Sequence, residues 1–292
     1  MTGKILKGVG GFYYVYADDS KIYECRARGI FRNKKMKPCV GDTVEIDVIS
    51  QDDLTGNLVK IHPRKNQLIR PLATNVDQAL VLFAIHEPEP DFHLLDRFVI
   101  MMEQQEIPVI LCFNKMDLAR EGEQEQITQD YRNSGVKVVF ESTKTQEGIE
   151  ELKQMLIGKT TVMAGPSGVG KSSTLNCLGA DKTMETGKVS QKIKRGRHTT
   201  RHSELIRVMD DTYLMDTPGF SSLYLAGIEK EDLRFYFPEF EPYENRCRFN
   251  GCVHIHEPDC AVREALEKGE ISQRRYDDYC LFYEELSQIK KW

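Results

Sequence analysis

An apolar segment, a glycine-rich turn and a helical segment follow one another without interruption between Thr160 and Leu178. The turn, Gly165-Pro-Ser-Gly-Val-Gly-Lys-Ser172, fits the pattern G-x-x-x-x-G-K-S. Glycines at these positions let backbone N–H groups point inward around phosphate oxygens, and the following helix N-terminus adds partial positive charge. A strand, this loop and a helix in that order predict a phosphate-binding loop in an α/β fold. The order disfavours the alternative, a glycine-rich turn without a ligand.

The residues of this loop have separate predicted roles. Lys171 would reach the β and γ phosphates of a nucleotide, which makes it a candidate catalytic residue, and Ser172 would ligate Mg²⁺. The residues expected to contact the nucleotide here are Gly165, Pro166, Ser167, Gly168, Val169, Gly170, Lys171, Ser172 and Ser173.

A second motif, Asn114-Lys-Met-Asp117, closes the apolar strand expected at Ile107–Phe113. A carboxylate here can accept both N1–H and N2–H of guanine, and adenine has no such pair of donors, so Asp117 predicts GTP rather than ATP. Asn114 would tie this loop to the phosphate loop, and the Lys115 stem would pack on the base. After the next strand, the backbone of Glu141-Ser-Thr-Lys144 could touch the guanine oxygen. The predicted base-binding residues are Asn114, Lys115, Met116, Asp117, Ser142, Thr143 and Lys144.

Two further segments predict a response to the γ-phosphate. Asp216-Thr-Pro-Gly219 follows an expected strand, so Asp216 would hold Mg²⁺ through water and the Gly219 N–H would meet the γ-phosphate. A basic stretch ends in Gly196-Arg-His-Thr-Thr200, where a threonine hydroxyl would complete the Mg²⁺ shell and order the loop. We favour Thr200 over Thr199 for this role and count Thr200 among the candidate catalytic residues.

The residue that orients the attacking water in Ras-like proteins is missing. Phe220 stands where a glutamine follows the glycine in that pattern, which predicts slow intrinsic hydrolysis. His198 could place the water once a partner orders its loop, and is the other candidate catalytic residue. The alternative is that His198 and Arg197 bind RNA phosphate.

Strand and helix patterns divide the chain into three parts. Short alternating runs at Gly11–Tyr16, Ile22–Cys25 and Thr43–Ile49, separated by turn residues, predict a five-stranded OB-type β-barrel. Strands alternating with helices follow and predict a mostly parallel sheet covered on both faces. The strands expected there are 79–85, 107–113, 136–140, 160–164, 204–209 and 213–215, and the helices are 94–106, 147–157 and 171–178. Helical periodicity returns at 261–269 and 272–290.

Charge is distributed unevenly along the chain. The 40 Lys and Arg residues against 45 Asp and Glu residues give a net charge of −5. Six Lys or Arg residues and no acidic residue nevertheless lie between Gly187 and His202, and a presumed barrel loop is basic around Phe31. The basic residues of that loop are Arg28, Arg32, Lys34, Lys35 and Lys37. Such surfaces attract nucleic acid, although a solvated loop without a partner and a Phe31 that merely fills the barrel are the alternatives.

No apolar run reaches the length of a membrane span, because the longest, Ala79–Ile85, is far short of the required ~20 residues. The N-terminus lacks the apolar stretch of a signal peptide. We therefore expect a cytoplasmic protein without a membrane partner.

Three cysteines and two histidines cluster near the C-terminus. Cys247, Cys252, His254 and Cys260 form a Cys₃His set, sufficient for a closed tetrahedral Zn²⁺ site, with His256 as a rival ligand. A site filled by four protein ligands has no room for an activated water, so its role would be structural. Unliganded cysteines are the alternative. Nearby arginines would touch RNA or form surface ion pairs, and they are Arg246, Arg248, Arg274 and Arg275.

The motifs are circularly permuted relative to Ras-like proteins, because Asn114–Asp117 precedes Gly165–Ser172, which precedes Asp216–Gly219. With this order, an OB-like N-terminus and a C-terminal Cys/His cluster, the chain resembles the ribosome small-subunit-dependent GTPase A family (RsgA, also called YjeQ or YloQ). Gly196–Thr200 and the cluster spacing match that family, and Phe220 agrees with it.

The resemblance implies a bacterial GTPase that binds the small (30S) ribosomal subunit and assists its late maturation. It also implies contact with 16S ribosomal RNA and proteins, hydrolysis stimulated by the subunit and used for release, and His254 as the fourth zinc ligand. We expect a monomer with an RNA-binding OB domain (1–68), a circularly permuted P-loop GTPase domain (69–225) and a zinc-binding, mostly helical domain (226–292). GTP or GDP, Mg²⁺ (held by Ser172, Thr200 and Asp216) and one structural Zn²⁺ are the expected cofactors.

Two other functions remain open from the sequence. The chain could be a nucleotide-responsive RNA-binding module of translation regulation in which hydrolysis is incidental. It could also be a generic ATPase, against which Asp117 argues.

Overall fold

The computed structural model describes residues 1–27, 31, 37–69, 71–179, 204–216, 224–225 and 227–288. The chain forms two compact units, which are described separately. The first comprises Met1–Ala79, Ile149–Ala164 and Lys171–Phe220, and the second comprises Leu80–Gly148, Gly165–Gly170 and Ser221–Trp292. Among the described residues, no helix combines the length and apolar character that a bilayer crossing requires.

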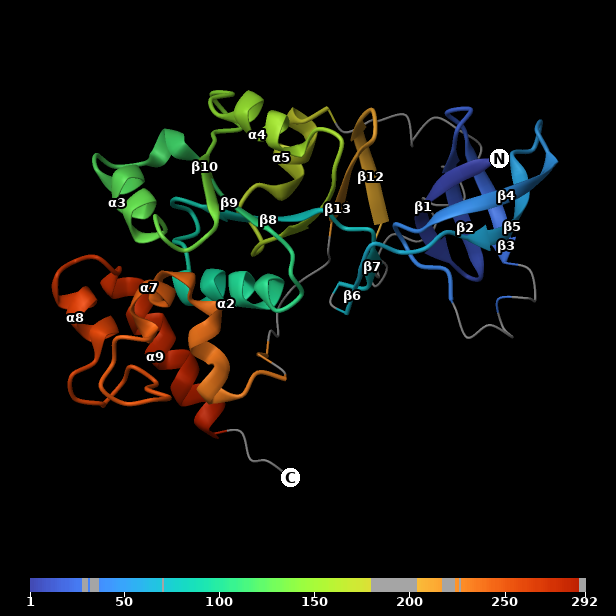
Figure 1. Ribbon diagram of the computed structural model, residues 1–292. Coiled ribbons are helices and arrows are strands. Elements are labelled where there is room, and N and C mark those ends of the chain that lie inside the picture. Colours follow the sequence, from blue (N-terminus) through green and yellow to red (C-terminus); the bar gives the residue numbers. More distant parts are fainter. Residues whose placement is uncertain are drawn as a thin grey trace. The chain divides into compact units, whose positions relative to one another are not determined.

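The first unit begins with a closed five-stranded barrel of the OB type (blue in Figure 1). Its strands are β1 (Thr2–Val9), β2 (Phe12–Ala17), β3 (Ile22–Ala27), β4 (Thr43–Ser50) and β5 (Thr55–Ile61). They pair in the order β1-β2-β3-β5-β4, and an antiparallel β1–β4 pairing closes the ring. Inward residues such as Ile5, Val15, Tyr23 and Leu58 are fully buried, and Phe31 joins them at 8% exposure, so it fills the barrel.

The first unit also contains three strands and two helices of the α/β part of the chain. The strands are β11 (Thr160–Ala164), β12 (Glu204–Met209) and β13 (Thr212–Asp216), and the helices are α4 (Ile149–Leu156) and α5 (Lys171–Cys177). β11 runs parallel to β13, and β12 runs antiparallel to β13. β12 also meets β1 beside an ion pair of 2.6 Å between Lys7 Nζ and Glu204 Oε2. A short hairpin, β6 (Gln67–Leu68) and β7 (Ala73–Thr74), follows the barrel.

The second unit holds the strands around the Asn114-Lys-Met-Asp117 motif, whose loop (114–117) is the predicted base-selecting loop. Its elements here are β8 (Gln78–Ala84, from Leu80 on), α2 (Phe92–Glu103), β9 (Val109–Asn114), η1 (Met116–Leu118), α3 (Glu123–Asp130) and β10 (Lys137–Phe140). β9 and β10 are parallel, and every residue of β8 and β9 is buried. Continuous apolar strands of this kind are typical of a sheet covered on both faces, as the sequence predicts.

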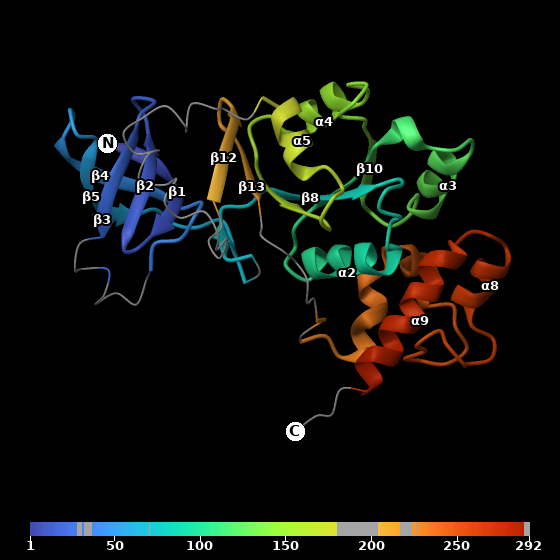
Figure 2. The same cartoon turned by 180° about the vertical axis from the view of Figure 1, so that it is seen from behind.

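The C-terminal segment, residues 227–288, is helical. It contains η4 (Lys230–Tyr236), η5 (Pro238–Phe240), α7 (Glu241–Glu244), α8 (Ala261–Glu267) and α9 (Gln273–Gln288). Phe237 and Phe240 stack at 5.4 Å between ring centroids, and Tyr279 meets both edge-on. In both views α9 lies beside α2 (Figures 1 and 2).

The contact between α2 and α9 buries charge. The fully buried Arg275 pairs with Asp96 at 2.8 Å and with Glu239 at 2.7 Å, and the Tyr131 hydroxyl donates to Asp96 at 2.7 Å. Arg274 lies beside it, 3.1 Å from Asp130. The sequence-based alternatives for Arg275, an RNA contact or a surface ion pair, are therefore both wrong. Its guanidinium is fully buried among acidic and aromatic side chains.

Arg275→Ala is expected to lower the free energy of unfolding by about 3–5 kcal/mol, because it leaves the buried Glu239 without its cation and Asp96 with only Arg274, 3.6 Å away. Denaturant unfolding of the full chain measures this loss. The exposed Arg246 supplies the control, since Arg246→Ala should change stability by less than about 0.5 kcal/mol. Equal stability of the two variants would contradict a stabilising buried pair.

Candidate functional site

Asn114 joins three loops of the second unit. It ends β9 and is fully buried. Its Oδ1 accepts hydrogen bonds from the N–H of Lys115 at 2.6 Å and the N–H of Thr143 at 3.2 Å. Its Nδ2 donates to the Val169 carbonyl at 2.9 Å. The contact with the glycine-rich loop that the sequence predicts for Asn114 is therefore present, and one amide sets the spacing of all three loops.

At two of its glycines, the glycine-rich loop approaches its neighbours too closely for a side chain. A Cβ at Gly170 would stand 2.1 Å from Asn114 Nδ2, and a Cβ at Gly165 would stand 2.1 Å from the Leu82 carbonyl. Gly170 also has a positive φ of 105°, which glycine adopts readily. These two glycines are thus required by packing before any ligand is considered.

Asp117 is held in place by the loop that follows β10. The Ser142 hydroxyl donates to its Oδ1 at 2.8 Å, and Lys144 Nζ lies 3.0 Å from its Oδ2. These hydrogen bonds, from Ser142 first and Lys144 second, lower the pKa of the Asp117 carboxyl. Each carboxylate oxygen keeps a further lone pair, so the ionised group can still accept two more donors. The sequence assigns this loop a backbone contact with guanine and misses the two side chains that orient Asp117.

The structure describes only some of the other residues that are predicted to bind the nucleotide. Lys171 is half-buried and Ser172 and Ser173 are exposed at the start of α5. Asp216 ends β13, and its side chain lies outside what the structure describes. Also outside the described residues are His198, Thr199, Thr200, Gly219, Phe220, the basic stretch 187–202, and Arg28, Arg32, Lys34 and Lys35 of the barrel loop.

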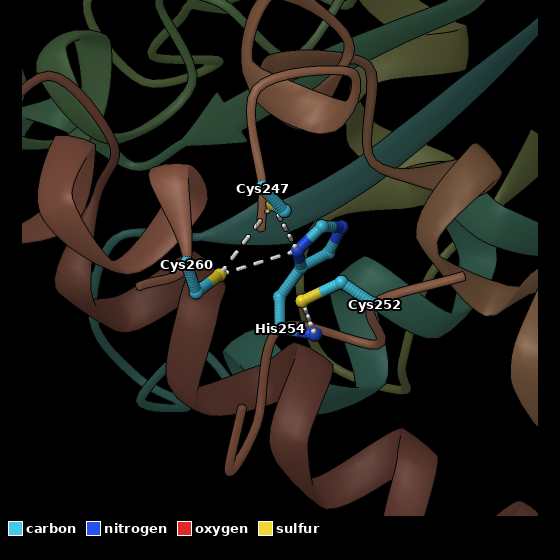
Figure 3. A group of neighbouring side chains, drawn as sticks. All are labelled: Cys247, Cys252, His254 and Cys260. Carbon is cyan, nitrogen blue, oxygen red and sulfur yellow. Dashed lines mark hydrogen bonds between the residues drawn. The ribbon is translucent and has the colours of Figure 1, made fainter. Parts of the chain in front are cut away.

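The structure brings Cys247, Cys252, His254 and Cys260 together at one point of the C-terminal segment (Figure 3). Their ligand atoms all lie within 4.8 Å of one another. The Nδ1 atom of His254 faces the sulfurs, at 3.6 Å from Cys247 Sγ and 3.3 Å from Cys260 Sγ. The rival, His256, is exposed and is not part of the cluster.

These separations suit a tetrahedral zinc ion. A Zn–S bond of about 2.3 Å places two sulfurs of a tetrahedron about 3.8 Å apart. Cys247 Sγ and Cys260 Sγ are 3.9 Å apart. Burial raises the pKa of the Cys252 thiol to about 12 and lowers that of the His254 imidazole to about 4. A neutral imidazole is ready to ligate, and a cation would stabilise the thiolates that burial disfavours.

Groups around the cluster hold its histidine. The Tyr276 hydroxyl donates to the His254 carbonyl at 2.6 Å, and the Phe240 ring meets the imidazole edge-on. Glu244 Oε1 lies 3.7 Å from His254 Nε2, too far for a hydrogen bond, and neither buried atom has a hydrogen-bond partner among the described residues. No sequence motif marks Glu244, so its place beside His254 appears only in the fold.

The same architecture is found in known proteins. A family model described as RsgA GTPase matches residues 61–226, and one described as RsgA N-terminal domain matches residues 2–55. The solved structure of YloQ, a circularly permuted GTPase, has 40% sequence identity and a TM-score of 0.78, covering 100% of this chain and 96% of that chain. YjeQ from Thermotoga maritima has 34% identity and a TM-score of 0.80, with 99% of each chain covered.

Curated relatives are similar to this chain over its whole length. The small ribosomal subunit biogenesis GTPase RsgA of Agathobacter rectalis is 56% identical over 302 aligned residues, covering 100% of both chains. The protein of the same name from Alkaliphilus metalliredigens is 45% identical and covers 99% of both. With a permuted guanine-nucleotide motif order, an OB-type barrel and a full-length match to these proteins, the chain belongs to the RsgA GTPase family.

Proposed function

We propose that this GTPase binds the small ribosomal subunit, assists its late maturation and is released when GTP is hydrolysed. The observation that carries the proposal is the junction at Asn114, which holds the base-selecting loop against the glycine-rich loop. A nucleotide spanning the two loops would have its base at Asp117 and its phosphates at Gly165–Gly170. The names of the full-length relatives supply the partner, the small subunit.

The proposed nucleotide site keeps the residues that the sequence suggests. Asp117 reads the guanine edge, the Lys115 stem packs on the base, and the loop from Gly165 to Ser173 binds the phosphates with Lys171. Mg²⁺, which offsets phosphate charge when bound, would be held by Ser172, Thr200 and Asp216. His198 would orient the attacking water on the subunit.

The flanking parts would grip the ribosome. We propose an RNA-binding OB domain at residues 1–68, a GTPase domain at 69–225 and a zinc-stabilised domain at 226–292, acting as a monomer on 16S ribosomal RNA and ribosomal proteins. A cytoplasmic location follows from that partner. Zinc held by Cys247, Cys252, His254 and Cys260 would have a structural role, because four protein ligands complete its coordination.

GTP hydrolysis is expected to be slow for the free protein and to rise about 10²-fold with purified small subunits. Large subunits and ATP are the controls and should give no stimulation. His198→Ala should retain GTP binding but lose the stimulated rate, whereas His202→Ala, in the same basic stretch, should keep it. Equal rates with and without small subunits would contradict the proposed partner.

A further inference from the structure

A short turn, His86–Glu89, follows β8 and lies beside the base-selecting loop. His86 is buried, with 8% of its surface exposed. Its Nδ1 is 2.9 Å from Glu89 Oε1, within the turn, and its Nε2 is 3.0 Å from Glu123 Oε2. Glu123 is the first residue of α3, the helix that follows the Asp117 loop. The imidazole therefore joins the end of β8 to the start of α3.

The geometry requires the charged form of His86. A neutral imidazole has one N–H donor and one acceptor, so it cannot donate to carboxylates at both nitrogens. The imidazolium donates at both, and the hydrogen bonds with Glu89 and Glu123 accordingly raise the pKa of His86. Arg120 also faces Glu123: its backbone N–H donates to Glu123 Oε2 at 2.7 Å, and its guanidinium is 3.8 Å from Glu123 Oε1.

The same turn touches both halves of the nucleotide site. The ammonium of Lys115 donates to the Glu87 carbonyl. A Cβ placed on Gly168 would be 3.8 Å from Pro88 Cδ, so the turn also lies next to the glycine-rich loop. Lys115 has a left-handed backbone, with φ at 66°, and the Glu87 carbonyl fixes the far end of its stem. The turn is thus a support behind the residue that would cover the base.

We propose that His86 is a positioning residue for the guanine base, acting through the Glu87 carbonyl on Lys115. The inference rests on the proposed nucleotide site and adds a residue that its motifs do not contain. Since the charged form makes both contacts, the support is present at low pH and is lost as the pH rises through the folded-state pKa of His86, which is raised. Affinity for guanine nucleotides should then fall with rising pH, and the fall should depend on His86.

The test is the binding of a fluorescent GDP analogue to the full-length protein across a pH series. At about pH 6.5, His86→Gln should weaken binding roughly tenfold, and by about pH 9 the ratio to wild type should approach 1. Glu89→Gln, at a side chain 75% exposed, keeps the fold and should show a smaller loss with the same pH trend. His62→Gln is the matched control, because His62 also faces a glutamate, Glu45 at 3.3 Å, but in the barrel.

The base provides a second readout. Loss of the support for Lys115 should weaken the binding of GDP and of inosine diphosphate by the same factor, because both bases present the same ring face. A displaced Asp117 would instead weaken the binding of GDP more than that of inosine diphosphate. Equal affinity of wild type and His86→Gln at every pH, or a loss that does not change with pH, would overturn the inference. If the wild-type protein does not bind GDP, the proposed nucleotide site is wrong. If it binds GDP tightly and His86→Gln does not change the affinity, only the inference about His86 is wrong.

Discussion

Asp117→Asn is expected to lower the affinity for GTP about a thousandfold. Asp117 is ionised and oriented by Ser142 and Lys144, with one lone pair left on each oxygen for a guanine N–H. An asparagine offers one acceptor and one donor, so it loses about 2 kcal/mol at each of two charge-assisted hydrogen bonds. Xanthine carries an oxygen where guanine carries its amino group, and the new amide can donate to it. Nucleotide preference should therefore move towards xanthosine triphosphate.

Competition between GTP and xanthosine triphosphate for the same fluorescent nucleotide measures this switch. Asp210→Asn is the control, since Asp210 is almost fully exposed, at 98% of its side chain, and should leave both affinities unchanged. A variant at Asp117 that still prefers GTP would remove this residue from base recognition. The lowered pKa of Asp117 adds a pH expectation: selectivity should persist through mildly acidic solution, because the carboxylate stays ionised there.

Removal of zinc is expected to unfold the C-terminal segment. Structural zinc sites contribute about 10 kcal/mol to folding, which is comparable with the total stability of a typical domain, about 5–15 kcal/mol. The loop that carries Cys252 and His254 has no helix or strand among its described residues and is otherwise held mainly by hydrogen bonds. Tyr276 and Tyr279 donate to its carbonyls at 2.6 and 2.7 Å, Arg234 donates to the Cys252 carbonyl at 2.8 Å, and Glu257 accepts from three of its N–H groups. Chelation, or Cys260→Ser, should therefore lower helical content and expose the segment to protease.

Metal analysis of purified protein, together with limited proteolysis, measures this effect. His256→Ala is the matched control, because His256 is exposed and lies outside the cluster. It should retain one zinc per chain, whereas His254→Ala should not. Full zinc content and protease resistance in Cys260→Ser would contradict a four-ligand site.

The parts of the fold that the sequence predicts are those with uninterrupted patterns. The expected strands at Thr160–Ala164 and Glu204–Met209 coincide with β11 and β12, because apolar strands in a covered sheet stand out from their flanks. Barrel strand β1 is not predicted, since a register shift between Ile5 and Lys7 breaks its alternation. β5 contains Gly56 and Asn57, which are weak strand formers, and its pairing with β3 is set by the barrel.

The sequence predicts neither helix α3 nor the burial of Arg275, and the reason differs from that for the barrel strands. The α3 sequence, EQEQITQD, buries only Ile127, so it has no apolar periodicity to detect. Arg275 looks like a surface residue because charged side chains are rarely buried, and its partner Asp96 is remote in sequence. The contact between Asn114 and the glycine-rich loop and the grouping of Cys247, Cys252, His254 and Cys260 are predicted correctly, because motifs of these residue types have fixed spacings. The side chains that hold their neighbours in place, such as Ser142 at Asp117 and Tyr276 at His254, carry no such spacing.

The hydrogen bond between Asn114 and Val169 also has a consequence for synthesis of the chain. Its two partners are 55 residues apart, and Asn114 leaves the ribosome first. At about 5–20 residues per second, the base-selecting loop waits about 3–11 s before the glycine-rich loop can reach it. During that interval the Asn114 amide lacks the Val169 carbonyl, and water has to take the place of that acceptor. The glycine-rich loop is therefore the later half that completes the site, and nucleotide can stabilise the growing chain only after Gly170 has emerged.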